Sequence, residues 1–206
     1  MVHWSSPDQR QGLPSRRTSP RSSRRSPSAE VARQAVAVGA TIINDVSSTL
    51  DGVAADLGVG WVAMHMQGDP RTMQDEPAYD NVVAEVRDFL VDRAERATAA
   101  GVPEVWIDPG IGFGKTIGHN LALLARLDVL VSTGWPVALG VSRKRFLGEL
   151  TRRSDQRGGD EATEPTSVYD RREASVAMAA WAFLQGVKVV RAHDVRATVQ
   201  ASKVVG

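Results

Sequence analysis

Short apolar runs and longer amphipathic segments alternate along the chain from residue 28 onward. Five of the runs are almost continuously apolar, which is typical of strands that are buried on both faces of a parallel sheet. These predicted strands span residues 41–48, 60–66, 104–108, 135–142 and 187–194.

Between the predicted strands, apolar residues recur at helical spacing. Ser28 can cap the first helix and Gly39 can end it, and the longest helix carries an apolar stripe that includes Val82, Val86 and Leu90. The predicted helices span residues 28–40, 51–58, 81–101, 119–134, 172–186 and 195–206, and the predicted polar loops span 67–80 and 152–171. This alternation predicts an α/β fold built on a parallel sheet.

Each predicted strand ends in polar residues, and the carboxyl ends of parallel strands share the rim where such folds place their chemistry. The five clusters are Asn44-Asp45, His65-Met66-Gln67, Asp108, Ser142-Arg143-Lys144 and Arg191-Ala192-His193-Asp194. Any one cluster could instead cap the helix that follows it, so capping remains the alternative for each.

Two of these clusters suit a heterocycle that carries an anionic tail. Asp108 can accept two hydrogen bonds from an amidine-like N–C–NH2 edge, or it can cap a helix that begins at Pro109. Arg191 and His193 alternate along a predicted strand and would grip a phosphate together, unless they are only a surface pair.

Three further strand-end residues have weaker signals. Asn44 offers a donor and an acceptor to a heterocycle edge, or it is a turn residue. Lys144 supplies a mobile positive charge, or it is a solvated loop lysine. His65 stands between two methionines, and we predict that its imidazole is buried in the core.

The glycine-rich stretch IDPGIGFGKT, residues 107–116, looks like a phosphate-binding P-loop. A P-loop requires a glycine five positions before the glycine of its Gly-Lys pair, but Pro109 stands at that position. The stretch is therefore interpreted as a turn that follows Asp108 at the end of a strand.

Composition is that of one soluble globular domain and excludes several kinds of site. The chain has 206 residues, 42% of them hydrophobic and 24% charged, and no apolar run has the length of a membrane span. The lack of cysteine excludes disulfides and thiolate metal sites and fits the cytoplasm. Four histidines without an HExxH pattern make a protein-held zinc site improbable, and no metal ligands are predicted.

The first 27 residues differ from the rest, because six arginines and no acidic residue lie between Arg10 and Arg25. Such a segment buries too little apolar area to offset its ordering entropy, so residues 1–27 are predicted to be a disordered tail before a domain over 28–206. A nucleic-acid-binding arm is the alternative. Since no aromatic residue interleaves the arginine run, neither nucleic acid nor a membrane is a predicted partner.

In their order and spacing, the segments INDVSS, MHMQG, IDPGIGFGK, GVSRKRFLG and RAHDV resemble dihydropteroate synthase, from about residue 28 to the end of the chain. The resemblance implies an eight-stranded β/α barrel of the TIM type and a transferase of folate biosynthesis. That family condenses a dihydropterin hydroxymethyl pyrophosphate with para-aminobenzoate. The products are dihydropteroate and pyrophosphate, and Mg²⁺ normally accompanies the pyrophosphate.

The resemblance also implies where the pterin ring binds. Asn44 and Asp108 would hold the ring, Lys144 would contact it, and Met66 would pack near it.

The aminobenzoate and the pyrophosphate would contact four other residues. Phe113 and Ser142 would lie beside the aminobenzoate, and Arg191 and His193 would bind the pyrophosphate. Lys144, Arg191 and His193 are then the predicted catalytic residues. Arg191 and His193, with the metal, would stabilise the negative charge that grows as the C–O bond breaks, and Lys144 would contact the ring.

Complete members of that family carry three more strands, with their motifs, before INDVSS. We therefore expect about five of eight strands, an incomplete barrel with open edges at its first and fifth strands, weak stability and low activity. The arginine-rich start would mark a truncation or an out-of-frame start that joins the family sequence near Ala29. The alternative function is an inactive fragment or a non-catalytic dimer partner of a full-length synthase, and a homodimer is a further candidate assembly.

Overall fold

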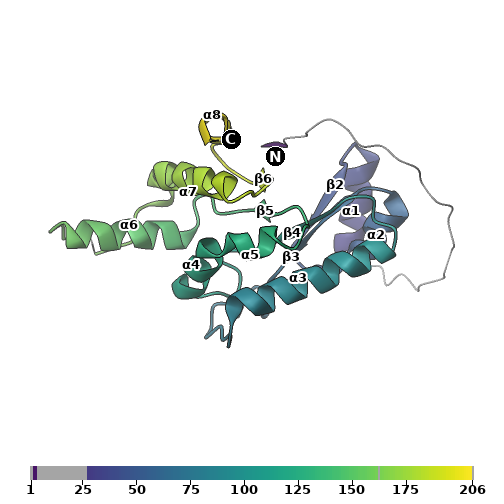
Figure 1. Ribbon diagram of the computed structural model, residues 1–206, viewed down its shortest axis with the longest axis horizontal. Helices are drawn as coiled ribbons and strands as arrows, with labels where there is room; N and C mark the ends of the chain where they lie inside the picture. The colour runs from purple at the N-terminus through teal and green to yellow at the C-terminus, as the bar shows by residue number, and fades with distance from the viewer. Residues whose placement is uncertain (1, 4–26, 162, 206) are drawn as a thin grey trace.

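The computed structural model describes residues 2–3, 27–161 and 163–205 (Figure 1). The strands are β1 (Val2–His3), β2 (Ile42–Asp45), β3 (Gly60–Met64), β4 (Val105–Asp108), β5 (Ala138–Leu139) and β6 (Val189–Val190). The helices are α1 (Pro27–Ala37), α2 (Asp51–Leu57), α3 (Val82–Ala99), α4 (Ile117–Ala125), α5 (Leu127–Val131), α6 (Arg145–Arg157), α7 (Arg172–Leu184) and α8 (Val195–Val205), with a 3₁₀ turn at Val168–Asp170. Most of the predicted tail, residues 4–26, lies outside the described residues.

The five predicted strands stand side by side in chain order. β2 pairs with β3, β3 with β4, and β5 with β6, all in parallel. A parallel bridge between Ile107 and Val137 joins β4 to the segment before β5, and the Ile107 amide donates to the Pro136 carbonyl at 3.0 Å. Helices lie around these strands (Figure 1), so the fold is α/β and forms part of a β/α barrel, as the sequence predicted.

The two outer strands of this arrangement differ in their pairing. Among the described residues, β2 has no further strand partner, whereas β6 pairs antiparallel with β1, with Val2 opposite Val190 and His3 opposite Val189. The prediction of an open edge at the fifth strand is therefore wrong. A two-residue strand at the far end of the chain has no periodicity, so the hydrophobic pattern could not reveal it.

Successive residues of each strand point to opposite faces of the sheet, and both faces are apolar. The main core beneath the helices takes one set of strand residues, which includes Trp61, Ala63, Val105, Ile107, Val137, Leu139 and Val190. A second cluster takes the alternate set: Val62, Trp106, Ala138 and Val189. The continuous apolar runs of the sequence therefore reflect burial on both faces, as predicted.

Helix α3 has the ends and the buried face that its sequence predicts. The Asn81 side chain accepts a hydrogen bond from the Ala84 amide at 3.1 Å, and the Glu85 carboxylate accepts one from the Asn81 amide at 2.8 Å. This reciprocal pair satisfies two amides that the first turn would otherwise leave unpaired. Val86 and Leu90 are fully buried and pack this helix against the sheet.

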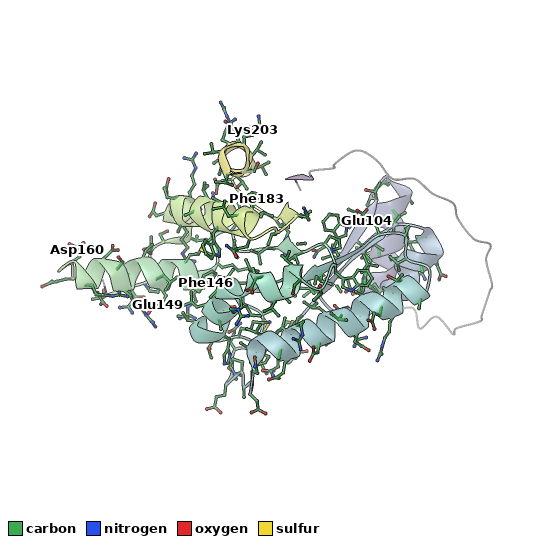
Figure 2. The ribbon with its side chains drawn as sticks, in the orientation of Figure 1. Glu104, Phe146, Glu149, Asp160, Phe183 and Lys203 are labelled. Atoms are coloured by element: carbon green, nitrogen blue, oxygen red, sulfur yellow. The ribbon has the colours of Figure 1, made fainter. Side chains whose placement is uncertain are left out.

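The predicted loop over residues 152–171 is wrong at its start, because α6 continues to Arg157. Phe146, in the first turn of α6, is buried. Glu149, one turn further on, accepts hydrogen bonds of 2.8 Å from both Arg152 and Arg153 (Figure 2). Pairs at these helical spacings stabilise a segment that has few apolar residues. The polar composition concealed the helix because no apolar stripe runs through its second half.

The predicted helix over residues 119–134 is divided in two. Thr116 caps α4 by accepting a hydrogen bond from the His119 amide at 3.1 Å, and the chain leaves helical geometry at Arg126 before α5 begins. Within the described residues, every helix is too short or too polar to pass through a bilayer.

Candidate active site

Three predicted site residues from different strands meet at the carboxyl rim of the sheet. The Arg191 guanidinium donates to the side-chain carbonyl oxygen of Asn44 at 3.2 Å, although the two residues are 147 positions apart. The same guanidinium forms an ion pair of 3.5 Å with Asp108. The Gly110 amide donates to the other Asp108 oxygen at 2.8 Å.

Asp108 is a buried carboxylate surrounded by positive charge. Its side chain is only 4% exposed, and burial raises its pKa, against the opposing effects of the Gly110 amide and of Arg191, Lys144 and Lys115. A carboxylate has about four acceptor positions, and the contacts with Gly110 and Arg191 use two of them. The remaining capacity can accept hydrogen bonds from a ligand.

Gly140, which follows β5, leaves the space that the Arg191 side chain occupies. A Cβ atom at Gly140 would lie 2.5 Å from the Arg191 Nη2 atom. A side chain at this position would therefore displace the guanidinium from Asn44 and Asp108.

Lys144 and Phe113 form the second part of the rim. The Lys144 ammonium lies 4.0 Å from the centre of the Phe113 ring, a cation–π arrangement. Burial lowers the pKa of Lys144, the negative charge of Asp108 opposes that shift, and Arg191 adds to it. Lys144 is therefore electrostatically linked to the cluster around Asp108, so the solvated-lysine alternative does not apply.

The loops that follow β5 and β6 are joined by two sets of contacts. The Ser142 hydroxyl accepts a hydrogen bond from the His193 amide at 3.2 Å and lies 3.0 Å from the His193 Nδ1 atom. Beside it, the Arg143 guanidinium donates to both carboxylate oxygens of Asp194, at 3.0 and 3.2 Å.

The prediction that Arg191 and His193 lie on the same strand is wrong. β6 ends at Val190, so both residues lie on the loop after it, where Arg191 turns to Asn44 and His193 to Ser142. The strand is short because its pairing with β5 stops at Leu139.

His65 and Met66, which follow β3, differ in their burial. The His65 imidazole is buried, with its ring centre 5.0 Å from that of Phe89 in an edge-to-face arrangement and 6.0 Å from that of Tyr79. The predicted core imidazole is therefore confirmed. Met66 follows it and is half-buried.

Asp45 is occupied by the turn before α2, although it does not cap that helix, whose N-cap residue is Leu50. Its carboxylate accepts hydrogen bonds from the amides of Ser47, Thr49 and Leu50 at 2.9, 2.7 and 2.7 Å, and from the Trp61 indole at 3.2 Å. These bonds hold the turn from β2 into α2 and leave Asp45 no role in ligand binding.

Lys115 is a buried charged residue that the sequence reasoning did not select. Its ammonium lies 2.9 Å from the His65 Nδ1 atom, and burial is the main cause that lowers its pKa to about 7. The Gly-Lys pair drew attention only as part of a P-loop pattern. In the structure this lysine points inward and is 3% exposed, which is not the geometry of a lysine that reaches a phosphate.

No group of three or more histidine, aspartate or glutamate residues in the described part of the chain could hold a metal ion. The carboxylate at the rim, Asp108, already contacts Gly110 and Arg191 and lies among cations. These residues do not fit a protein-held Mg²⁺ ion.

Comparison with known proteins shows the family to which the chain belongs. The family model described as pterin binding enzyme matches residues 26–193. Dihydropteroate synthase of Mycobacterium leprae is 46% identical over 186 residues, which cover 86% of this chain and 63% of that protein. The chain thus spans less than two thirds of the length of this curated relative.

Two solved structures of dihydropteroate synthase from Thermus thermophilus have the same fold. The complex with 4-aminobenzoate is 45% identical, with a TM-score of 0.76, and the match covers 85% of this chain and 66% of that one. The complex with 6HMPPP is 44% identical, with a TM-score of 0.74, and the match covers 85% of this chain and 67% of that one.

Proposed function

The chain belongs to the family of pterin-binding enzymes, and from this premise we propose that it acts in dihydropteroate synthesis. In this reaction a dihydropterin hydroxymethyl pyrophosphate condenses with para-aminobenzoate to give dihydropteroate and pyrophosphate. The observation that carries the proposal is the buried Asp108 carboxylate, held at a strand end between Gly110 and Arg191. The solved relatives with 4-aminobenzoate and with 6HMPPP support the same substrate pair.

Asp108 recognises the pterin. Its free acceptor positions take hydrogen bonds from the amidine-like edge of the ring, a pairing that resembles that of guanidinium with carboxylate. Asn44 adds an amide at the same rim, and Arg191 holds it in place. Lys144 lies against the ring, and Met66 packs near it as an apolar wall.

The second substrate and the leaving group meet the loops after β4, β5 and β6. Phe113 and Ser142 lie beside the aminobenzoate, and Arg191 and His193 bind the diphosphate. When the C–O bond to the pterin methylene breaks, its electron pair leaves with the diphosphate, and the Arg191 guanidinium and hydrogen bonds from His193 stabilise that charge. The aminobenzoate nitrogen then forms the new C–N bond and releases a proton.

Mg²⁺ enters this scheme as part of the substrate, bound to the diphosphate oxygens. Mg²⁺ usually keeps several waters and binds substrate phosphates through few protein ligands. The scarcity of carboxylates at the described rim fits an ion that arrives with the diphosphate.

Calorimetric titration with a pterin pyrophosphate analogue tests the proposal. Asp108→Asn removes the negative acceptor and should weaken binding about 10- to 100-fold, since hydrogen bonds to charged groups contribute about 1.5–3 kcal/mol. Asp128→Asn, an exposed substitution on α5, is the matched control and should bind as the unmodified chain does. Failure of the unmodified chain to bind the analogue would refute the proposal.

We further propose that the chain works in the cytoplasm and forms a homodimer. The lack of cysteine fits a reducing compartment. Trp181 and Leu184 on α7 are 43% and 60% exposed, which offers apolar area to a second copy. Sedimentation velocity of the chain with and without a Leu184→Lys substitution tests the dimer, which should weaken in the variant.

A further inference from the structure

The Lys115 ammonium lies inside a ring of acceptors from two separate segments. The segment after β3 contributes the His65 Nδ1 atom at 2.9 Å and the His65 carbonyl at 3.4 Å. The glycine-rich loop after β4 contributes the carbonyls of Gly110 at 3.2 Å and Phe113 at 3.0 Å. An ammonium has three protons, so this lysine is fully occupied within the protein.

The His65 side of this ring requires a defined tautomer. Burial first, and then the charge of Lys115, lower the pKa of His65 to about 3, so the imidazole is neutral near pH 7. Below the Lys115 pKa of about 7 the lysine is mainly an ammonium, which can only donate. Under those conditions the His65 Nδ1 atom accepts, and the ring proton sits on Nε2.

The loop side of the ring leads directly to the substrate-binding groups. Gly110 accepts from Lys115 through its carbonyl and donates its amide to Asp108 at 2.8 Å. Phe113 accepts from Lys115 through its carbonyl, and its ring lies under the Lys144 ammonium. Lys115 therefore connects Gly110, the hydrogen-bond partner of Asp108, with Phe113, which would lie beside the aminobenzoate.

The loop also packs closely on the segment after β3. Gly110 has φ of 63°, and a Cβ atom there would overlap the His65 carbonyl oxygen. Several backbone carbonyls thus converge on this point, and the ammonium neutralises their mutual repulsion.

We propose that Lys115 is a positioning residue that acts as an internal cation, fixing the glycine-rich loop so that Asp108 and Phe113 face the pterin and the aminobenzoate. The inference rests on the proposed function for its substrates. It adds a residue that touches neither substrate but sets the geometry of both contacts.

The first test needs no ligand. Below the Lys115 pKa of about 7, nitrogen-15 NMR of the unmodified chain should show His65 as the Nε2–H tautomer with a hydrogen-bonded Nδ1 atom. In Lys115→Met the Nδ1 signal should shift to that of a free acceptor, and the amide signals of Gly110 and Phe113 should move. An Nδ1–H tautomer in the unmodified chain would overturn the proposal.

The second test measures function with the same variants. Lys115→Met should bind the pterin pyrophosphate analogue at least about tenfold more weakly, and Lys115→Gln, which keeps two donors, should recover part of that loss. Lys203→Met on the exposed face of α8 is the matched control and should bind normally (Figure 2). If the unmodified chain binds and Lys115→Met binds equally well, Lys115 has no positioning role. If the unmodified chain does not bind, the proposed function fails as well.

Discussion

At the scale of single residues, protonation of His65 would lower the stability of the folded chain. Its ring is enclosed by Lys115 and Phe89, and its pKa falls from 6.5 to about 3, mainly through burial. Between these two values the unfolded chain binds a proton that the folded chain does not. The stabilising contribution of neutral His65 is therefore complete above pH 6.5 and is lost as the pH falls toward 3.

A His65→Asn substitution should remove this pH dependence, because the asparagine oxygen can still accept from Lys115 but does not titrate. The free energy of unfolding of the unmodified chain should fall, relative to the variant, by up to about 1.4 kcal/mol per pH unit below about pH 6. Urea unfolding followed by circular dichroism from about pH 7 to about pH 4 measures both curves. Parallel curves would show that His65 binds a proton equally well in the folded and the unfolded chain.

Asp45 and Asp108 show how far single residues could be interpreted from the sequence. Both end a strand, and both could have been caps or ligand-binding groups. The structure separates them, because Asp45 is surrounded by backbone amides and Asp108 by side-chain cations. Those surroundings come from residues distant in the chain, such as Arg191, so local sequence could not distinguish the two aspartates. The roles of the rim residues remain predictions.

At the scale of elements, the turn between β5 and α6 is held by partners from α7 and from the turn before α8. Arg143 has φ of 57°, a left-handed conformation that a residue other than glycine rarely adopts without support. Its amide donates to the Ser175 hydroxyl at 2.9 Å, and its guanidinium holds Asp194 through two hydrogen bonds. The ion pair therefore fixes both Ser142 and His193, which flank its two members.

A double-mutant cycle should detect this link. Arg143→Leu and Asp194→Asn should show a coupling of about 1.5–3 kcal/mol in the free energy of unfolding, because the pair is half-buried and bidentate. The exposed pair Arg96 and Asp92 on α3 is the control, with an expected coupling of about 0.3–0.5 kcal/mol. Equal couplings for the two pairs would mean that the Arg143–Asp194 contact does not order the turns.

The order of elements was predictable because each strand or helix has its own periodicity. Boundaries were less predictable where pairing decides them. The apolar run over 135–142 predicts a longer strand than β5, which is limited to Ala138–Leu139 because only these residues pair with β6. The second half of α6 was missed because charged pairs, with few apolar residues, stabilise it.

At the scale of the whole molecule, the hydrophobic pattern predicted five parallel strands in order, and the motifs predicted the barrel to which they belong. It could not predict β1, since two residues from the start of the chain pair with a strand near its end. Contacts of such sequence separation depend on how distant segments pack together, which local periodicity does not encode.

One side of the molecule combines an unpaired strand with exposed apolar side chains. Among the described residues β2 is the last strand of its sheet, and a groove of about 530 Å³ lies between it and α1. Val31 and Val46 line this groove and are 64% and 36% exposed. Unpaired strand edges beside apolar surface are where chains associate.

Beyond the dimer proposed through α7, the purified chain should therefore associate further and reversibly through this groove as its concentration rises. Placing charges in the groove, with Val31→Glu and Val46→Lys together, should raise the apparent dissociation constant at least about tenfold, because a second copy would have to desolvate them. Val204→Lys on α8, where the valine is 85% exposed, is the matched control and should leave association unchanged. Sedimentation velocity over a wide concentration range measures all three chains. Further association that persists unchanged in the double variant would show that it does not form through this groove.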